Sequence, residues 1–80
     1  MSKYFFHLRN GDDLLLDPEG IELDGPESIQ AQALYEARSI LSHDMMEGRI
    51  VLDQRIDIET SDRTVVYSLS FADAVEIVAA

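Results

Sequence analysis

The 80-residue sequence lacks cysteine and tryptophan and has only four glycines. Without cysteine there is no disulfide, no thiolate metal ligand and no thiol nucleophile. The glycines are isolated, which leaves no glycine-rich loop for a phosphate group. Six basic residues against sixteen acidic ones give a net charge of −10, so little positive charge is available for a phosphate backbone. We therefore expect no direct binding to nucleic acid.

Long hydrophobic runs are absent too. No stretch approaches the ~18 consecutive apolar residues of a membrane-spanning helix, and the first residues lack a signal-peptide pattern. We expect a cytoplasmic protein that does not associate with a membrane. What is present is a globular composition, 46% hydrophobic and 28% charged. Without repeats or linkers, the chain is expected to form a single domain over residues 1–80, with a core small enough that oligomerisation could add burial.

Alternating apolar residues predict strands on both sides of a central helical segment. The first strand begins at residue 4 and ends at Asn10-Gly11, a strong hairpin signal. Residues 14–23 are interpreted as one interrupted or bulged second strand. Alternation predicts a third strand within 50–59 and a fourth over 65–71, joined by the short connection 61–63.

A long helix is predicted between Pro26, which suits the first helical position, and Gly48, which suits the position after the last turn. The positions that share one face are mostly apolar: Ile29, Ala33, Leu34, Ala37, Ile40, Leu41 and Met45. Asp44 interrupts this face near its end. Either the helix frays past Met45, or the carboxylate of Asp44 meets Arg49 or Arg55.

These elements predict an α+β two-layer sandwich, with an antiparallel sheet in ββαββ order and one long helix on one face. Ser70 and Asp73 have a spacing close to that of a capping box, which predicts a short C-terminal helix over 72–77, with a strand over 75–78 as the alternative. The predicted core consists of Tyr4, Phe6, Leu8, Leu23, Ile29, Ala33, Ala37, Ile40, Leu41, Ile56, Ile58, Val65, Tyr67, Leu69 and Phe71.

Several short motifs are distributed along nearly the whole chain. They are the opening Tyr4-Phe5-Phe6-His7-Leu8-Arg9-Asn10-Gly11, then Asp17, Glu19-Gly20 and Leu23, an alanine-rich helix over 33–37, and the ending Phe71-Ala72-Asp73-Ala74-Val75-Glu76-Ile77. On these motifs the chain resembles a family of small proteobacterial proteins known only as a domain of unknown function. The motifs are mostly structural in type, so the resemblance implies a fold and no activity.

The element order, with a small sheet before a helix rich in alanine and glutamate, is also similar to the HicB-type antitoxin fold. No DNA-binding helix-turn-helix or ribbon is appended. This second resemblance implies an alternative function: an antitoxin-like or inhibitor module whose negative surface meets a basic partner protein.

Acidic residues gather between Asn10 and Ser28, with no base among them: Asp12, Asp13, Asp17, Glu19, Glu22, Asp24 and Glu27. Clustered carboxylates suit a hard cation such as Ca²⁺, but the EF-hand spacing is absent. Aspartate, asparagine and glycine also populate turns for local reasons. We therefore interpret the segment as solvated turns and predict no metal site there.

His43 and Glu47 are neighbours on the predicted helix, and His7 on the first strand is a possible third group. A metal site needs three or more ligands placed together, so a surface pair is the simpler interpretation. No serine lies in a nucleophile-elbow motif. We predict a protein that is not an enzyme and needs no cofactor.

Two surfaces could meet a partner. The outer face of the helix has no charge at its centre, and it contains Ala31, Tyr35, Ser39, Ser42 and Met46. The uncovered face of the sheet is predicted to present Phe5 and Val66 at its centre. Tyrosine and methionine are enriched at the centres of interfaces, and small residues let helices approach closely.

The leading hypothesis is a small, acidic, non-catalytic module that binds another protein or itself as a homodimer. Its contact would be the outer helix face or the open sheet face. Negative charge is expected along 12–27 and at the outward positions Asp53, Asp57 and Glu59, and it is missing from the outer helix face.

Overall fold

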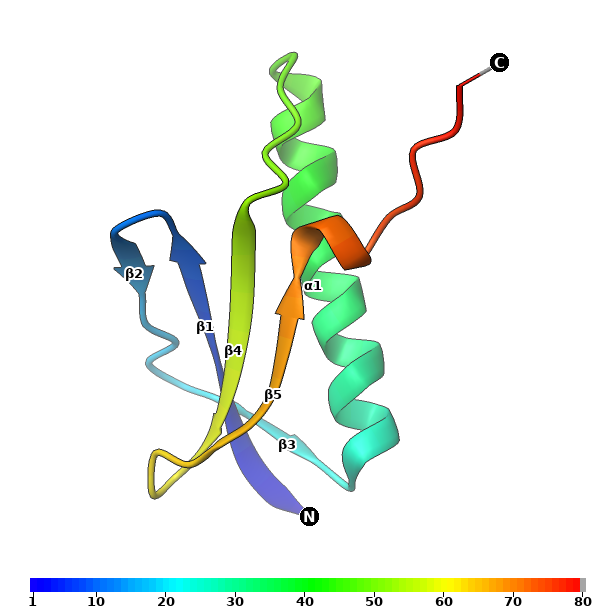
Figure 1. Ribbon diagram of the computed structural model, residues 1–80. Helices are drawn as coiled ribbons and strands as arrows, with labels where there is room; N and C mark the ends of the chain where they lie inside the picture. The colour runs from blue at the N-terminus through cyan, green and yellow to red at the C-terminus, as the bar shows by residue number, and fades with distance from the viewer. Residues whose placement is uncertain (80) are drawn as a thin grey trace.

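The computed structural model describes residues 1–79 as two layers, a five-stranded antiparallel sheet and one long helix (Figure 1). The elements are β1 (Ser2–Asn10), β2 (Asp13–Leu15), β3 (Ile21–Leu23), α1 (Pro26–Met46), β4 (Gln54–Thr60), β5 (Val65–Ser70) and the 3₁₀ turn η1 (Phe71–Asp73). The strand order is β2-β1-β4-β5, and β3 also pairs with β1. The predicted fold class and ββαββ order are confirmed, with the second strand divided into β2 and β3.

The division of the second strand follows the prediction of an interrupted strand. β2 pairs with the end of β1, where Leu15 lies opposite Leu8, and β3 pairs with its beginning, where Ile21 lies opposite Tyr4. Residues 16–20 leave the sheet between the two pairings. The middle of β1 therefore has no strand on this side, and other groups must satisfy its backbone there.

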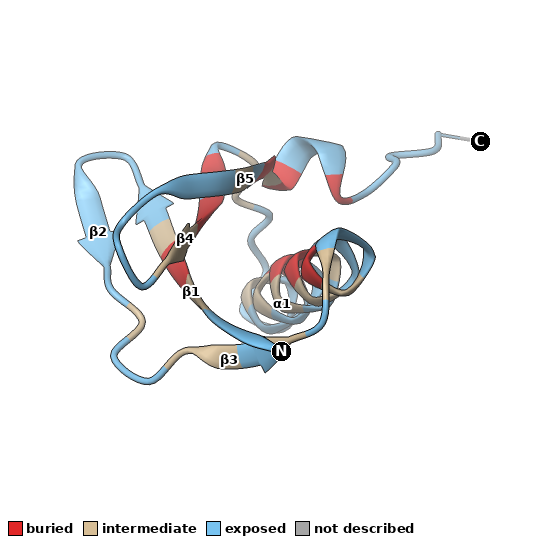
Figure 2. Cartoon of the chain, turned by 90° about the horizontal axis from the view of Figure 1, so that it is seen from below, coloured by how far each residue is buried: buried red, intermediate tan, exposed pale blue. Residues whose placement is uncertain are grey.

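The core lies between the sheet and α1 (Figure 2). Most predicted core residues are buried, and the partly buried ones, Tyr4, Leu8, Leu23, Ile40 and Tyr67, pack at its margin. The helix ends at Met46. Gly48 follows it with a positive φ of 84°, which suits a residue without a side chain.

Asp44 is accommodated in a way that neither alternative predicted. The helix does not fray before Met46, and no arginine meets the carboxylate of Asp44 within residues 1–79. Instead, the buried amide of Gln54 donates to Asp44 Oδ2 at 3.4 Å and to the carbonyl of Val51 at 3.1 Å. A neutral amide at the start of β4 thus takes the place of the expected cation.

The prediction that Val65 lies in the core is wrong. The register between β4 and β5 shifts after Ile58, which pairs with Tyr67, so that Glu59 pairs with Val65 and one extra residue, Val66, is accommodated in β5. Such a bulge changes the side of the sheet on which the residue before it, Val65, places its side chain. Val65 is consequently 52% exposed.

The C-terminal prediction of a helix over 72–77 is also wrong. One 3₁₀ turn follows β5, and Ser70 forms no side-chain cap at its start. Phe71 and Ala74 are buried, whereas residues 75–79 form neither helix nor strand and extend away from the body (Figure 1). Ile77 and Val78 are 71% and 78% exposed. Within residues 1–79, no helix has both the length and the apolar character needed to cross a bilayer.

Candidate functional site

The outer face of α1 brings together five of the predicted contact residues. Ala31, Tyr35, Ser39, Ser42 and Met46 are all exposed, and the side chains of Tyr35 and Met46 are 68% and 86% exposed. They share one face because the buried residues Ile29, Ala33, Ala37 and Leu41 hold the opposite face of the helix against the sheet. An open, shallow hollow follows this surface, lined by Ala31, Leu34, Tyr35, Arg38, Ser39 and Ser42.

Two polar groups on this face form hydrogen bonds within the chain. Ser39 Oγ donates to the carbonyl of Tyr35 at 2.8 Å, and Arg38 Nε donates to the carbonyl of Ala74 at 2.8 Å. The guanidinium of Arg38 is therefore directed towards η1 at the flank of the helix. These two groups would keep their hydrogen bonds beneath a partner that covered the face.

The other two predicted contact residues lie elsewhere. Phe5 is on the open face of the sheet, but it is half-buried, and its ring stacks with that of His7 at a centroid distance of 6.4 Å. Val66 does not belong to this face. At the bulge it lines a hollow on the helix side of the sheet, together with Ile29 and Tyr67. The expected apolar patch of Phe5 and Val66 is therefore not formed.

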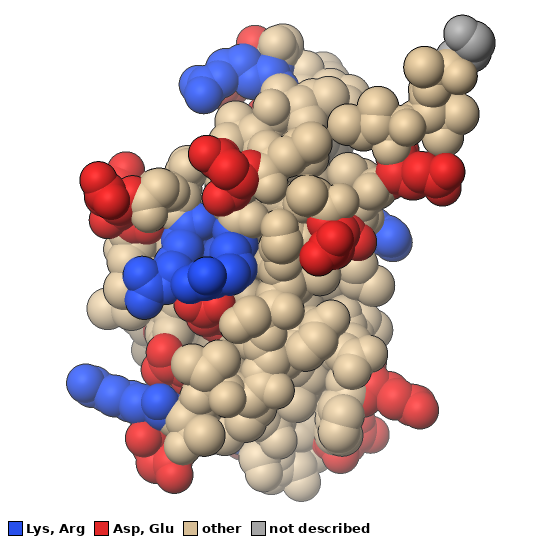
Figure 3. Space-filling model, in the orientation of Figure 1, with Lys and Arg blue, Asp and Glu red and all other residues tan. Residues whose placement is uncertain are grey.

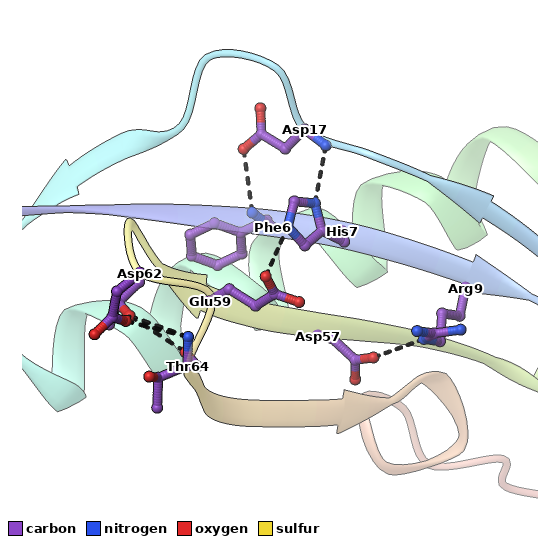
Figure 4. A network of polar contacts seen from close by, with 9 residues as sticks. Phe6, His7, Arg9, Asp17, Asp57, Glu59, Asp62 and Thr64 are labelled. Atoms are coloured by element: carbon purple, nitrogen blue, oxygen red, sulfur yellow. Dashed lines mark hydrogen bonds and ion pairs between the residues drawn. The ribbon is translucent and has the colours of Figure 1, made fainter.

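Polar groups gather instead on the open sheet face and at the β2–β3 edge, where the first set surrounds Asp17 (Figure 4). The carboxylate of Asp17 accepts hydrogen bonds from the backbone N–H of Phe6 at 3.1 Å and from those of Glu19 and Gly20 at 3.1 Å each. Its own N–H donates to His7 Nδ1 at 3.0 Å. This residue replaces the missing strand between β2 and β3.

The electrostatics of Asp17 follow from these contacts. Burial by itself raises the pKa of a carboxyl group, but the backbone donors of Gly20, Phe6 and Glu19 outweigh that effect and lower the pKa of Asp17 below its ordinary value. Gly20 allows the loop to approach this closely. Its φ is +73°, and a Cβ there would lie 2.9 Å from Cγ of Lys3.

The second set of polar groups surrounds Asp57, which is 7% exposed. Arg9 Nε donates to its Oδ2 at 2.9 Å, Arg55 Nε lies 2.8 Å from its Oδ1, and Ser68 Oγ donates to Oδ1 at 2.8 Å. Burial opposes ionisation, but the bonds from Ser68, Arg55 and Arg9 outweigh it and lower the pKa of Asp57. Figure 3 shows basic and acidic side chains side by side over this part of β1 and β4.

Asp57 therefore points outward as predicted but is not solvated, because cross-strand neighbours enclose it. The pairs Arg9–Arg55 and His7–Asp57 lie directly opposite one another in the β1–β4 ladder. The sequence shows these residue types in alternation, yet only the register tells which of them meet. The signal for Asp17 was stronger, since aspartate before Pro18, Glu19 and Gly20 suits a turn closed by a side-chain oxygen.

The two histidines are not brought together. His43 Nε2 lies 3.6 Å from Glu47 Oε1 on the exposed surface of α1, as the spacing predicted. His7 is on the face of the sheet away from the helix, and its Nε2 lies 3.6 Å from Glu59 Oε1. Within residues 1–79, no group of three or more potential ligands could hold a metal ion.

Comparison with known proteins gives one match. A family described as a domain of unknown function, DUF6894, matches residues 3–72. No curated protein and no solved structure matches the chain. The resemblance to a family of unknown function is therefore confirmed, whereas the likeness to the HicB-type antitoxin fold has no support.

Proposed function

The chain belongs to the DUF6894 family, a domain of unknown function, and we propose that this member is a non-catalytic protein-binding module that self-associates through the outer face of α1. The observation that carries the proposal is the exposure of Tyr35 and Met46 on a face whose remaining centre consists of Ala31, Ser39 and Ser42. On a chain with a net charge of −10, this face has no charge at its centre.

Residue types support a protein contact. Tyrosine and methionine are enriched in the cores of interfaces, where charged residues are depleted. Tyr35 has few side-chain torsions to immobilise, so its burial costs little conformational entropy. Ala31 and Ser39 are small enough to let a second helix approach closely.

The length of α1 supports a second copy as the partner. A standard interface buries about 800 Å² per partner, and the whole chain exposes 5727 Å². α1 has 21 residues and therefore spans about 31 Å at ~1.5 Å per residue, most of the longest dimension of the molecule, 43 Å. Two antiparallel helices could pair along this length with the same residues on both sides, as a two-fold axis requires.

Sedimentation equilibrium over a range of concentrations tests the proposal with Tyr35→Glu. The wild-type chain is expected to pair through this face. Tyr35→Glu is expected to weaken this contact at least about tenfold, since ~1.4 kcal/mol corresponds to a factor of ten and a buried, unpaired carboxylate costs more than that.

The matched control is Leu16→Glu. It also replaces an apolar side chain, 61% exposed, with a carboxylate. Leu16 follows β2 at the β2–β3 edge of the sheet and is not on the outer face of α1. This variant should dimerise like the wild type. A monomeric wild-type chain at high micromolar concentration, or a dimer equally strong in Tyr35→Glu, contradicts the proposal.

A further inference from the structure

The two edges of the sheet differ in a way that points to a second contact between copies. The edge formed by β2 and β3 consists of two three-residue strands separated by a segment that contains Pro18. Each strand carries a charged residue, Asp13 in β2 and Glu22 in β3. Charges, proline and short strands are the means by which proteins prevent edge-to-edge pairing. This edge is protected against other chains.

The opposite edge has little of this protection. β5 (Val65–Ser70) is six residues long and contains neither a charge nor a proline. Its bulge lies at the beginning, which leaves Tyr67–Ser70 regular. We infer that β5 pairs antiparallel with β5 of a second copy, so that the two sheets become one continuous sheet about a two-fold axis.

The direction of the backbone groups follows from the ladder. The N–H of Phe6 points to Asp17, away from β4, so the neighbouring residues of β1 form the bonds to β4. The same alternation makes Ile58 and Tyr67 a bonded pair between β4 and β5. Ser68 must then direct its N–H and carbonyl away from β4, towards the free edge.

This direction fixes the register of the pairing. Only residues that face the free edge can exchange hydrogen bonds, and pairing Ser68 with Ser68 of the second copy centres the ladder on the regular part of β5. Tyr67 then lies opposite Leu69 of the second copy on the helix side of the sheet, an apolar cross-strand pair. The hydroxyl of Ser68 remains on the other side, bonded to Asp57.

Charges at the two ends of β5 agree with an antiparallel arrangement. Arg63 lies just before the strand and Asp73 just after it, and both are exposed. Neither forms an ion pair within residues 1–79. In an antiparallel pair, the end of β5 next to Arg63 lies beside the end of the other copy's β5 next to Asp73, so the two ends carry complementary charges.

Amide hydrogen exchange of the unchanged chain provides the direct test, because it does not depend on a variant that folds. In the monomer the N–H of Ser68 is free, and in the proposed dimer it is bonded. Its exchange is expected to slow at least tenfold as the concentration is raised through the dimerisation range, while the exchange rate of Asp12 in the β1–β2 turn stays constant. A dimer in which Ser68 exchanges as fast as in the monomer would overturn the inference.

The variant Ser68→Pro, compared with Ser68→Ala, gives a second measurement. Both remove the hydroxyl that bonds Asp57, but only proline also removes the backbone N–H that faces the free edge. An edge strand tolerates proline at such a position. Ser68→Pro is expected to weaken the dimer at least tenfold relative to Ser68→Ala. Equal dimerisation of the two variants contradicts edge pairing.

The inference rests on the proposed self-association, and the outcomes separate the two. A dimer sensitive to Tyr35→Glu, with an unprotected Ser68 amide, refutes edge pairing alone. A dimer insensitive to Tyr35→Glu, with a protected Ser68 amide, refutes the helix contact alone. A chain that stays monomeric refutes both.

Discussion

Asp17 offers the sharpest test of how the interrupted edge is held together. Its carboxylate accepts three backbone hydrogen bonds, and its own N–H donates to His7. Replacing Asp17 with alanine removes all three acceptor contacts and leaves the backbone donors without partners from the chain. The variant should therefore be clearly less stable than the wild type.

The magnitude follows from which donors water can reach. The N–H of Phe6 is part-buried in the middle of β1, and leaving such a donor unsatisfied costs about 1–3 kcal/mol. The N–H of Glu19 is exposed and can bond to water, so its loss adds roughly 1 kcal/mol or less. We expect Asp17→Ala to lower the free energy of unfolding by about 2–4 kcal/mol, a large share of the roughly 4–12 kcal/mol of a chain this long.

Urea unfolding at pH 7, followed by circular dichroism, measures this difference. Asp12→Ala is the control, because Asp12 is an exposed acid of the neighbouring turn that accepts no hydrogen bond from a side chain or loop within residues 1–79. It should change the free energy of unfolding by less than about 0.5 kcal/mol. An equally small change in Asp17→Ala would refute the role given to Asp17 in replacing the missing strand.

The pH dependence gives a second check on the same residue. The folded state lowers the pKa of Asp17, so its stabilising contribution is complete above the ordinary aspartate pKa of about 3.9 and is lost as the pH falls through the lower folded value. The difference between wild type and Asp17→Asn should be largest at neutral pH and shrink towards pH 2.5. A difference that stayed constant would contradict the charged role of the carboxylate.

Two further predictions concern its surroundings. Gly20→Ala should destabilise the fold by at least about 1 kcal/mol, because φ is +73° and the new Cβ would lie 3.0 Å from the carbonyl oxygen of Tyr4. Equal urea midpoints for the variant and the wild type would contradict this prediction and show that the loop can move to accommodate the Cβ. Asp57→Asn should cost about 2 kcal/mol at pH 7, since the pKa of Asp57 is lowered in the folded state, and the cost should fall as the pH drops below about 4. Urea unfolding at pH 7 and pH 3 measures it, and a cost that rises in acid would contradict the sign.

Periodicity and turn residues were sufficient for most of the architecture. The helix between Pro26 and Gly48 follows from proline at its start, glycine at its end and an apolar stripe between them, which are local signals. The interruption of the second strand was also visible, because Asp17 and Pro18 break the alternation. The exposed outer face of α1 follows from the same helical period, so its five residues were found together.

Other features depend on which strands meet. The bulge at Val66 exposes Val65 and moves Val66 to the helix side, and nothing within the alternating run Val65–Ser70 signals it, because a bulge arises from the match between two strands. The uncovered sheet face was expected to be apolar around Phe5, yet cross-strand pairing placed the charged residues of β1 and β4 against each other there.

The sequence by itself determined that this chain folds into one helix on a small antiparallel sheet, because the helical and strand periods are properties of neighbouring residues. It also determined that the outer helix face has no charge at its centre. Only the tertiary structure decided that Asp57 is buried between two arginines, that Asp17 replaces a strand, and that β5 is the edge with neither a charge nor a proline. Strand order and register are long-range properties, and they decide which side chains meet.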